Sequence, residues 1–195
     1  KYSYGVKPLI FSADTSDGVL QVNPGTLFGE MMGSSALSAY MDTDIFSEMI
    51  DHVDMLDAQY EVLRGRWPES YDEMVMVLSD PHQITDYMAY TLGLRDIETL
   101  DQMMQLLMEG KEPGDPGESL KWTYEDLMAL RFRLVNASDK YKYNSEYGVW
   151  EDMSEDESYM RDLVENGEEL KIVGIVCPKE GVSTTTLSPG IGYTA

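Results

Sequence analysis

Residues that could carry out chemistry are few in this chain, and their spacing joins none of them into a catalytic arrangement. The sequence contains one cysteine, Cys177, and two histidines, His52 and His82. A reactive thiolate needs a base or a cationic group beside it. Cys177 instead lies in the apolar stretch IVGIVC, and nothing in the sequence pairs either histidine with it. We therefore expect Cys177 to be a small buried hydrophobic residue that forms no internal disulfide.

Two acidic stretches and the 14 methionines are the candidates for metal binding. Residues 14–18 (DTSDG) resemble the start of an EF-hand loop but lack its ligand alternation and its closing Glu. Residues 151–157 (EDMSEDE) could attract a divalent cation, or could cap a helix and form its solvated first turn. Soft thioethers bind Cu(I), which makes the pairs Met31-Met32 and Met103-Met104 a copper alternative. Core filling is the favoured interpretation for Met74, Met76, Met88, Met103 and Met160.

Three tryptophans, Trp67, Trp122 and Trp150, could line a carbohydrate groove, but packing in the core is the favoured interpretation. Spacing cannot single out the carboxylate pair of a glycosidase, because an acidic chain offers dozens of such pairs. Residues 136–138 (NAS) match a glycosylation acceptor, a pattern that often arises by chance. No phosphate-binding glycine loop occurs. We therefore assign no catalytic, cofactor-binding or metal-ligating residue, and expect no cofactor.

Charge is the strongest signal in the composition. Thirty-six Asp and Glu residues stand against 14 Lys and Arg, a formal net charge of −22 over 195 residues. Such a surface repels phosphate backbones and anionic lipids, so nucleic acid is excluded as a partner. No apolar stretch reaches the roughly 20 residues of a membrane helix. No signal peptide is visible, and the missing initiator Met leads us to expect a fragment cut at both ends.

Strands and helices are predicted to alternate without a regular βαβ rhythm, which favours an α+β (mixed α/β) fold. The predicted strands are residues 8–14, 18–22, 60–64, 73–78, 131–135, 140–143 and 169–176. The first two form a hairpin signal around Asp-Gly, and the unbroken apolar run at 73–78 predicts burial on both faces. The predicted helices are residues 44–53 capped by Asp44, 84–91 stopped by Gly93, 96–107, a short one capped by Thr123, and one from Ser154 to about Val164. Residues 26–42 are expected to be irregular or partly helical, and 111–118 (KEPGDPGE) to be a loop.

A series of phrases from residue 60 onward resembles the extracytoplasmic domains of MacB/FtsX-type ABC transporter permeases from Gram-positive bacteria. They begin with YEVLRGRWP at 60–68, followed by YDEMVMVL at 71–78 and TLGL at 91–94. KWTYEDL at 121–127, YGVW at 147–150, LKIVGIV at 170–176 and GIGYT at 190–194 complete the series. The order and spacing of the phrases carry the resemblance, which does not extend to the first 59 residues.

The resemblance implies a MacB-like periplasmic core type ectodomain, inserted between two transmembrane helices of a permease and facing the outside of the cell. In that family the ectodomain comprises two small α/β subdomains, so residues 60–150 become a candidate inserted subdomain within a single domain of residues 1–195. The implied role is export or mechanotransmission, with helix motion coupled to a substrate or partner outside the membrane. The ectodomain of that family is not an enzyme, so the resemblance implies that this chain is not one either and that ATP would be hydrolysed by a separate cytoplasmic ATPase subunit. A second permease copy and a peptide or protein substrate are further candidate partners.

The alternative is a secreted or surface-anchored acidic module that binds a cationic peptide or a carbohydrate; a glycosidase-like enzyme is a more distant third. The permease interpretation predicts that the two chain ends lie together on the membrane side. We accordingly expect the strand at 169–176 to lie beside the N-terminal strand at 8–14 or at 18–22.

Overall fold

The computed structural model describes residues 9–16, 18–22, 45–79, 84, 86–95, 122–182 and 184–194. In these residues it shows an α+β fold, with helices packed around one mixed sheet, as the sequence predicts. The expectations for residues 26–42, 96–107 and 111–118, and for the Met31-Met32 and Met103-Met104 pairs, lie outside the described residues. Among the described residues, no helix combines the length and the apolar character needed to cross a membrane.

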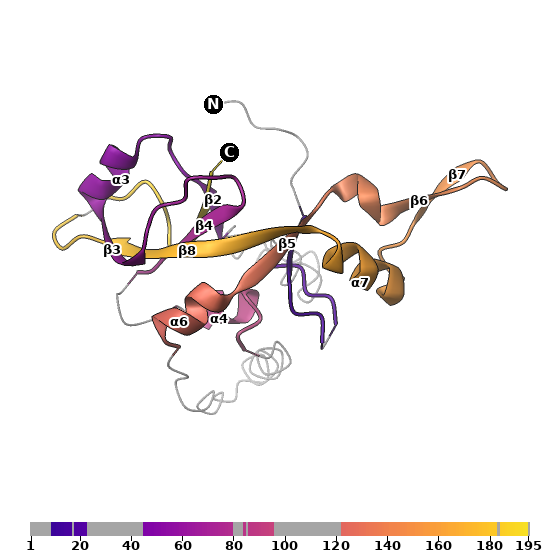
Figure 1. Cartoon of the computed structure of the whole chain (residues 1–195), viewed down its shortest axis with the longest axis horizontal. Coiled ribbons are helices and arrows are strands. Elements are labelled where there is room, and N and C mark those ends of the chain that lie inside the picture. Colours follow the sequence, from indigo (N-terminus) through magenta and orange to yellow (C-terminus); the bar gives the residue numbers. More distant parts are fainter. Residues whose placement is uncertain are drawn as a thin grey trace, which may run out of the picture.

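The sheet is organised around one long strand, β8 (Glu168–Pro178), which runs along most of the body in Figure 1. The order of strands is β1-β5-β8-β4-β9-β2, and β3 also pairs with β8. Because β4 and β3 both pair with Gly174–Val176 of β8, they must lie on opposite edges of it. On one edge β8 is paired antiparallel first with β5 and then, further along, with β3. The other strands of the sheet are β1 (Leu9–Ser12), β2 (Phe46–Glu48), β3 (Tyr60–Gly65), β4 (Glu73–Val77), β5 (Arg131–Val135) and β9 (Gly190–Tyr193).

Two glycines allow β3 to leave the sheet beside β8. Gly65 has a backbone φ of +73°, which residues with a Cβ rarely adopt. A Cβ on Gly174, which pairs with it, would lie 2.1 Å from the carbonyl oxygen of Arg66. The close approach of these two backbones places Arg66 beside β8, where its amide donates to the Val173 carbonyl oxygen at 3.1 Å.

Short helices border the sheet, and polar caps define two of them: α3 (Val53–Gln59), α4 (Asp86–Thr91), α6 (Tyr124–Ala129) and α7 (Glu157–Glu165). Thr123 caps α6 as expected, in a reciprocal capping box with Asp126. Asp156 caps α7 by accepting a hydrogen bond from the Tyr159 amide. The helix dipole favours the acidic residues in both first turns. α6 packs against β8, and α7 packs against β5.

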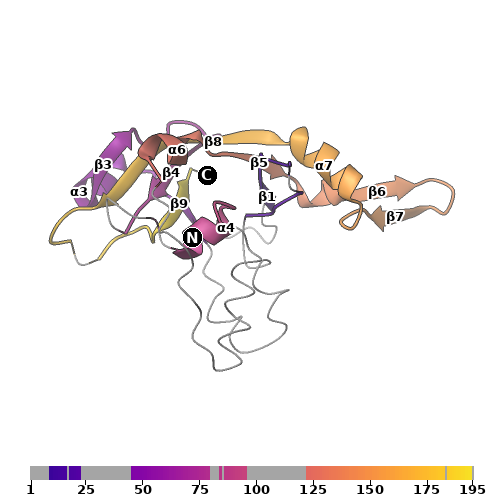
Figure 2. The same ribbon diagram turned by 90° about the horizontal axis from the view of Figure 1, so that it is seen from below.

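A two-stranded hairpin extends from this body: β6 (Tyr141–Asn144) pairs antiparallel with β7 (Val149–Asp152). A short 3-10 helix, η1 (Ala137–Lys140), leads into it. Figures 1 and 2 both show the hairpin at the opposite end of the molecule from α3 and β3. We call residues 141–152 the hairpin arm.

The core lies on both faces of the central strands. All five residues of β4 are buried, which confirms the prediction of a strand covered on both faces. The predicted core methionines of the described chain, Met74, Met76, Met88 and Met160, are buried, at most 6% exposed. Cys177 is also buried, at 4% exposure, so the prediction of a buried residue is confirmed.

Two predicted elements differ from the structure. Residues 45–53 were expected to form one helix, but Phe46–Glu48 is strand β2, and the helix begins only at Val53. Residues 46–48 form a strand and not a helix because they pair with β9, and the Ile191 amide donates a 2.6 Å hydrogen bond to the Ile45 carbonyl oxygen just before β2. The second strand of the first predicted hairpin, residues 18–22, is reduced to a single bridge between Gln21 and Phe11.

The expected adjacency of the N-terminal and C-terminal strands is wrong. β5 lies between β1 and β8, and three strands separate β1 from β9 in the sheet order. Burial explains the order: the apolar strands β4 and β8 occupy the centre, where both faces are covered, while β1 and β2 form the edges. Residues 60–150, the candidate inserted subdomain, contribute β3, β4 and β5 to the same sheet as β8.

Candidate functional site

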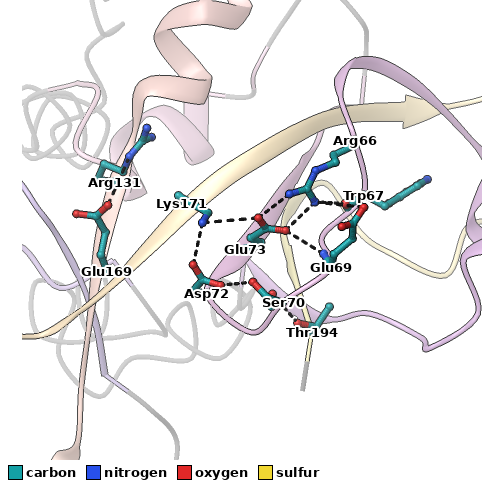
Figure 3. A network of polar contacts seen from close by, with 10 residues as sticks. All are labelled: Arg66, Trp67, Glu69, Ser70, Asp72, Glu73, Arg131, Glu169, Lys171 and Thr194. Atoms are coloured by element: carbon teal, nitrogen blue, oxygen red, sulfur yellow. Dashed lines mark hydrogen bonds and ion pairs between the residues drawn. The ribbon is translucent and has the colours of Figure 1, made fainter.

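A set of charged side chains crosses the centre of the sheet where β3 leaves it and β4 begins. We call Arg66, Asp72, Glu73 and Lys171, with the connecting residues Glu69 and Ser70, the polar cluster (Figure 3). The Arg66 guanidinium donates to both carboxylate oxygens of Glu73, at 2.7 and 2.6 Å. Such bidentate pairs are the strongest ion pairs of proteins and fix both side chains in one geometry.

Glu73 is the buried member of the polar cluster: its side chain is 8% exposed. The Glu69 amide donates a further hydrogen bond to it, and Lys171 Nζ lies 3.6 Å from it. Chiefly because of the Arg66 hydrogen bonds, and then the Glu69 amide, the pKa of Glu73 is lowered to about 2. Glu73 therefore stays ionised at neutral pH and does not act there as a proton donor.

The second ion pair of the cluster ties β8 to the start of β4. Lys171 Nζ donates to Asp72 Oδ2 at 2.9 Å, and this hydrogen bond raises the pKa of Lys171. The Ser70 hydroxyl and Lys171 both donate to Asp72 and lower its pKa. Both shifts favour the charged forms of Asp72 and Lys171, which suits a cluster that joins β8 to the start of β4.

The polar cluster also reaches the chain beyond β9. The Thr194 hydroxyl donates to the Ser70 carbonyl oxygen at 3.2 Å (Figure 3). On the other edge of β9, the Met49 amide donates to the Tyr193 carbonyl oxygen at 2.8 Å. The last described residues are therefore held from both sides, by the β3–β4 connection and by the segment after β2.

A second attachment joins the chain before β9 to the opposite end of the sheet. The buried Tyr60 hydroxyl donates to the Leu187 carbonyl oxygen at 2.8 Å and accepts from the Leu187 amide at 2.7 Å. Gln59 Oε1 accepts from the amide and the hydroxyl of Thr186. The connection between β8 and β9 is thereby fixed to β3, which leaves β9 attached at both its ends.

Among the described residues, the hairpin arm holds the largest group of exposed apolar side chains. Of the nine large hydrophobic residues exposed in the described chain, five belong to it: Tyr141, Tyr143, Tyr147, Val149 and Trp150. The rings of Tyr143 and Trp150, directly opposite each other in the register, have their centroids 5.2 Å apart. Side chains alternate between the faces of a strand, so Tyr141, Tyr143, Trp150 and Asp152 share one face.

The three tryptophans do not come together in one groove. Trp67 is buried, its ring packs edge-on against Tyr60, and its indole N–H donates to Asp57. Trp122 packs against the main core. Trp150 is 67% exposed, so the prediction of a core role is confirmed for two tryptophans and wrong for this one.

The two acidic stretches considered for calcium hold local hydrogen bonds in the structure. Asp14 accepts from the amide and the hydroxyl of Ser16, as a turn residue does. Asp152 accepts in the same way from Ser154, and Asp156 caps α7. The helix-cap interpretation of 151–157 is therefore confirmed for Asp156 and Glu157, whereas Glu151 and Asp152 belong to strand β7. Within the described residues, no three His, Cys, Asp or Glu side chains come together as metal ligands.

A small pocket of about 190 Å³ lies at the base of the hairpin arm, between β5, η1 and the end of α7. Asn136, the asparagine of the glycosylation pattern, is exposed and lines it together with Asp139 and Asn166. Asn136 Nδ2 donates to Asp139, so its amide is engaged in closing the turn.

No protein-family model, curated protein or solved structure matches this chain. The sequence reasoning assigned no site residue, and it missed both the polar cluster and the exposed arm. One signal for the cluster was present: Glu73 is a lone acid at the head of an otherwise apolar strand, which calls for a buried partner. The exposure of Trp150 had no comparable signal, because aromatic residues in a strand usually indicate burial.

Proposed function

We propose that this chain is the extracellular domain of an ABC transporter permease of the MacB/FtsX type. The observation that supports it is where the resembling phrases lie in the fold. Strands β3 and β4, with Arg66, Asp72 and Glu73 of the polar cluster, come from YEVLRGRWP and YDEMVMVL. Helix α6, which packs on β8, comes from KWTYEDL. Strands β8 and β9 come from LKIVGIV, which includes Lys171 of the cluster, and from GIGYT. Phrases far apart in sequence thus build one continuous sheet with its central ion pairs.

The attachment of β9 suits a domain that transmits movement. In the proposed permease the chain continues from β9 towards a membrane helix, so a displacement of that helix acts first on β9. β9 passes it to β4 through four paired positions, and β4 passes it to β8 through five. The hydrogen bond from Thr194 to Ser70 carries the same displacement directly into the polar cluster. Rigid coupling of this kind moves the whole sheet and the hairpin arm with the helix.

The protein would lie in the cell membrane with this domain on the extracellular side. A separate cytoplasmic ATPase subunit would supply the energy, and a second permease copy could complete the transporter. In this arrangement the domain itself is not an enzyme: it acts on a peptide or protein outside the cell by changing position.

The test uses the complete gene. We expect a hydrophobic segment of about 20 residues directly before Lys1 and another shortly after Ala195. An epitope inserted at residues 145–148, in the exposed turn of the hairpin arm, should be removed by protease added to intact cells, while a cytoplasmic protein in the same cells stays whole. Solubilised protein should co-purify with an ABC ATPase. A gene that begins and ends near these residues, or an epitope protected in intact cells, would refute the proposal.

One observation favours the alternative of a secreted or surface-anchored binding module: the exposed aromatic residues of the hairpin arm. The same gene distinguishes the two functions. A cleavable signal peptide and a wall anchor, in place of flanking membrane helices, would support the binding module.

A further inference from the structure

The hairpin arm presents apolar side chains that its own folding does not bury. Trp150 is 67% exposed, Tyr147 71% and Tyr143 53%, and no residue of β6 or β7 is buried. Monomeric proteins rarely gather exposed aromatic residues in one place unless something binds there. The contact between the Tyr143 and Trp150 rings stabilises the hairpin, but it leaves the outer surfaces of both rings, and Tyr141, open to solvent.

Hydrogen bonds hold the base of the arm and join it to the body. The Met153 amide donates to the Lys140 carbonyl oxygen at 2.9 Å and closes the base of the hairpin. The Tyr159 hydroxyl of α7 donates to the Asp139 carbonyl oxygen at 2.8 Å and fixes η1 to that helix. Both views show the arm directed away from the sheet (Figures 1 and 2). A partner can therefore approach its faces without meeting the rest of the described chain.

The two faces of the arm carry different charges. On one face lie the rings of Tyr141, Tyr143 and Trp150 with the carboxylate of Asp152. The opposite face holds Lys142, Asn144, Val149 and Glu151, where Asn144 donates to Glu151 at 2.7 Å. Among the strand residues the aromatic face therefore has an anion and no cation, although Lys140, at the end of η1, is near enough to lower the pKa of Asp152. The hydrogen bonds from Ser154 have the larger effect on that pKa and keep Asp152 ionised.

We infer that the aromatic face of the hairpin arm is a docking surface for a basic segment of a partner protein, one that places a Lys or Arg side chain over Trp150 and towards Asp152. Tryptophan is the best cation–π partner among the aromatic side chains, and a neighbouring carboxylate adds a charge-assisted hydrogen bond. The net charge of −22 attracts such a segment from a distance and repels an anionic lipid surface. The permease proposal does not specify the partner outside the cell, and this inference gives that partner a chemical class. The inference itself concerns only binding to this chain and does not depend on the permease proposal.

The test measures binding of a short fluorescein-labelled peptide of alternating Arg and Ser to the 195-residue chain, by fluorescence anisotropy. Trp150→Ala should weaken binding about fivefold or more, because the cation–π contact is lost while the net charge stays at −22. Val149→Ala is the matched control, since Val149 is exposed on the other face of the same strand, and it should change binding by less than about twofold. Trp150→Phe keeps a ring and should recover part of the loss, which separates loss of the contact from melting of the hairpin.

Equal binding by Trp150→Ala, Val149→Ala and the native chain would overturn the inference, because overall charge would then account for it. So would equal binding of a peptide with Glu in place of Arg. Soluble cello-oligosaccharide and phosphatidylglycerol vesicles test the other occupants: if either bound in a way that depended on Trp150, while the Arg peptide did not, the surface would have a different ligand. None of these measurements uses the permease, so a negative binding result would not refute the proposed function. Equally, a gene without flanking membrane helices would refute the proposed function but not the docking surface.

Discussion

Replacing Glu73 by Gln tests whether the polar cluster holds the sheet together. The substitution keeps the shape of the side chain and removes its charge, so Arg66 and Lys171 lose the carboxylate between them. The glutamine oxygen still accepts one hydrogen bond from Arg66, and Arg66 is 46% exposed and can be solvated. The loss should therefore lie below the full value of the ion pair.

The magnitude follows from the pKa of Glu73, which is lowered from 4.5 to about 2 in the fold. A carboxyl with a lowered pKa stabilises the folded state fully above its unfolded pKa, and this contribution is lost as the pH falls through the folded one. The difference corresponds to about 3 kcal/mol at pH 7, about 2 kcal/mol at pH 3.5 and about 1 kcal/mol at pH 2.5. We expect Glu73→Gln to cost about 2–3 kcal/mol at pH 7, and the gap between native chain and variant to close as the pH falls.

Urea unfolding followed by circular dichroism, at pH values from 7 to about 2.5, measures this gap directly. The other acidic residues are common to both chains, so their titration cancels in the difference. Glu69→Gln is the matched control: it removes an acid that is 77% exposed and 3.8 Å from the same Arg66, and should cost less than about 0.5 kcal/mol. A gap below about 0.5 kcal/mol at pH 7, or one that stays the same at pH 7 and pH 2.5, would refute the reasoning.

Three further substitutions test other parts of the fold, each by the same urea unfolding. Tyr60→Phe removes the hydroxyl that pairs with both backbone groups of Leu187 and should cost about 1–3 kcal/mol, whereas a cost near zero would show that Leu187 finds other partners. Gly65→Ala places a Cβ 2.0 Å from the Val173 carbonyl oxygen at φ +73° and should cost more than about 2 kcal/mol; native stability would contradict the close approach of β3 to β8. Thr123→Ala removes the cap of α6 and should cost about 0.5–2 kcal/mol, with Thr123→Ser expected to restore most of it.

The elements that the sequence determined are those whose information is local. The cap at Thr123 and the apolar run of β4 depend on residues that are neighbours in the chain. α7 and β8 were also found at nearly their observed positions, because a cap, a helical apolar spacing and a strand-like run mark them without help from distant segments. The α+β fold class follows from these elements alone.

Tertiary structure decided whatever depends on a partner far along the chain. Residues 45–53 carry a helical apolar spacing, yet β2 forms there because β9 offers it a ladder of backbone hydrogen bonds, and pairing between distant segments overrides a local preference. The pairing of Arg66 with Glu73 needed β3 and β4 to enter one sheet on opposite edges of β8. Trp150 is exposed because no described element covers its face of the hairpin arm, and no run of residues can encode this by itself: a strand is buried only where another element packs on it.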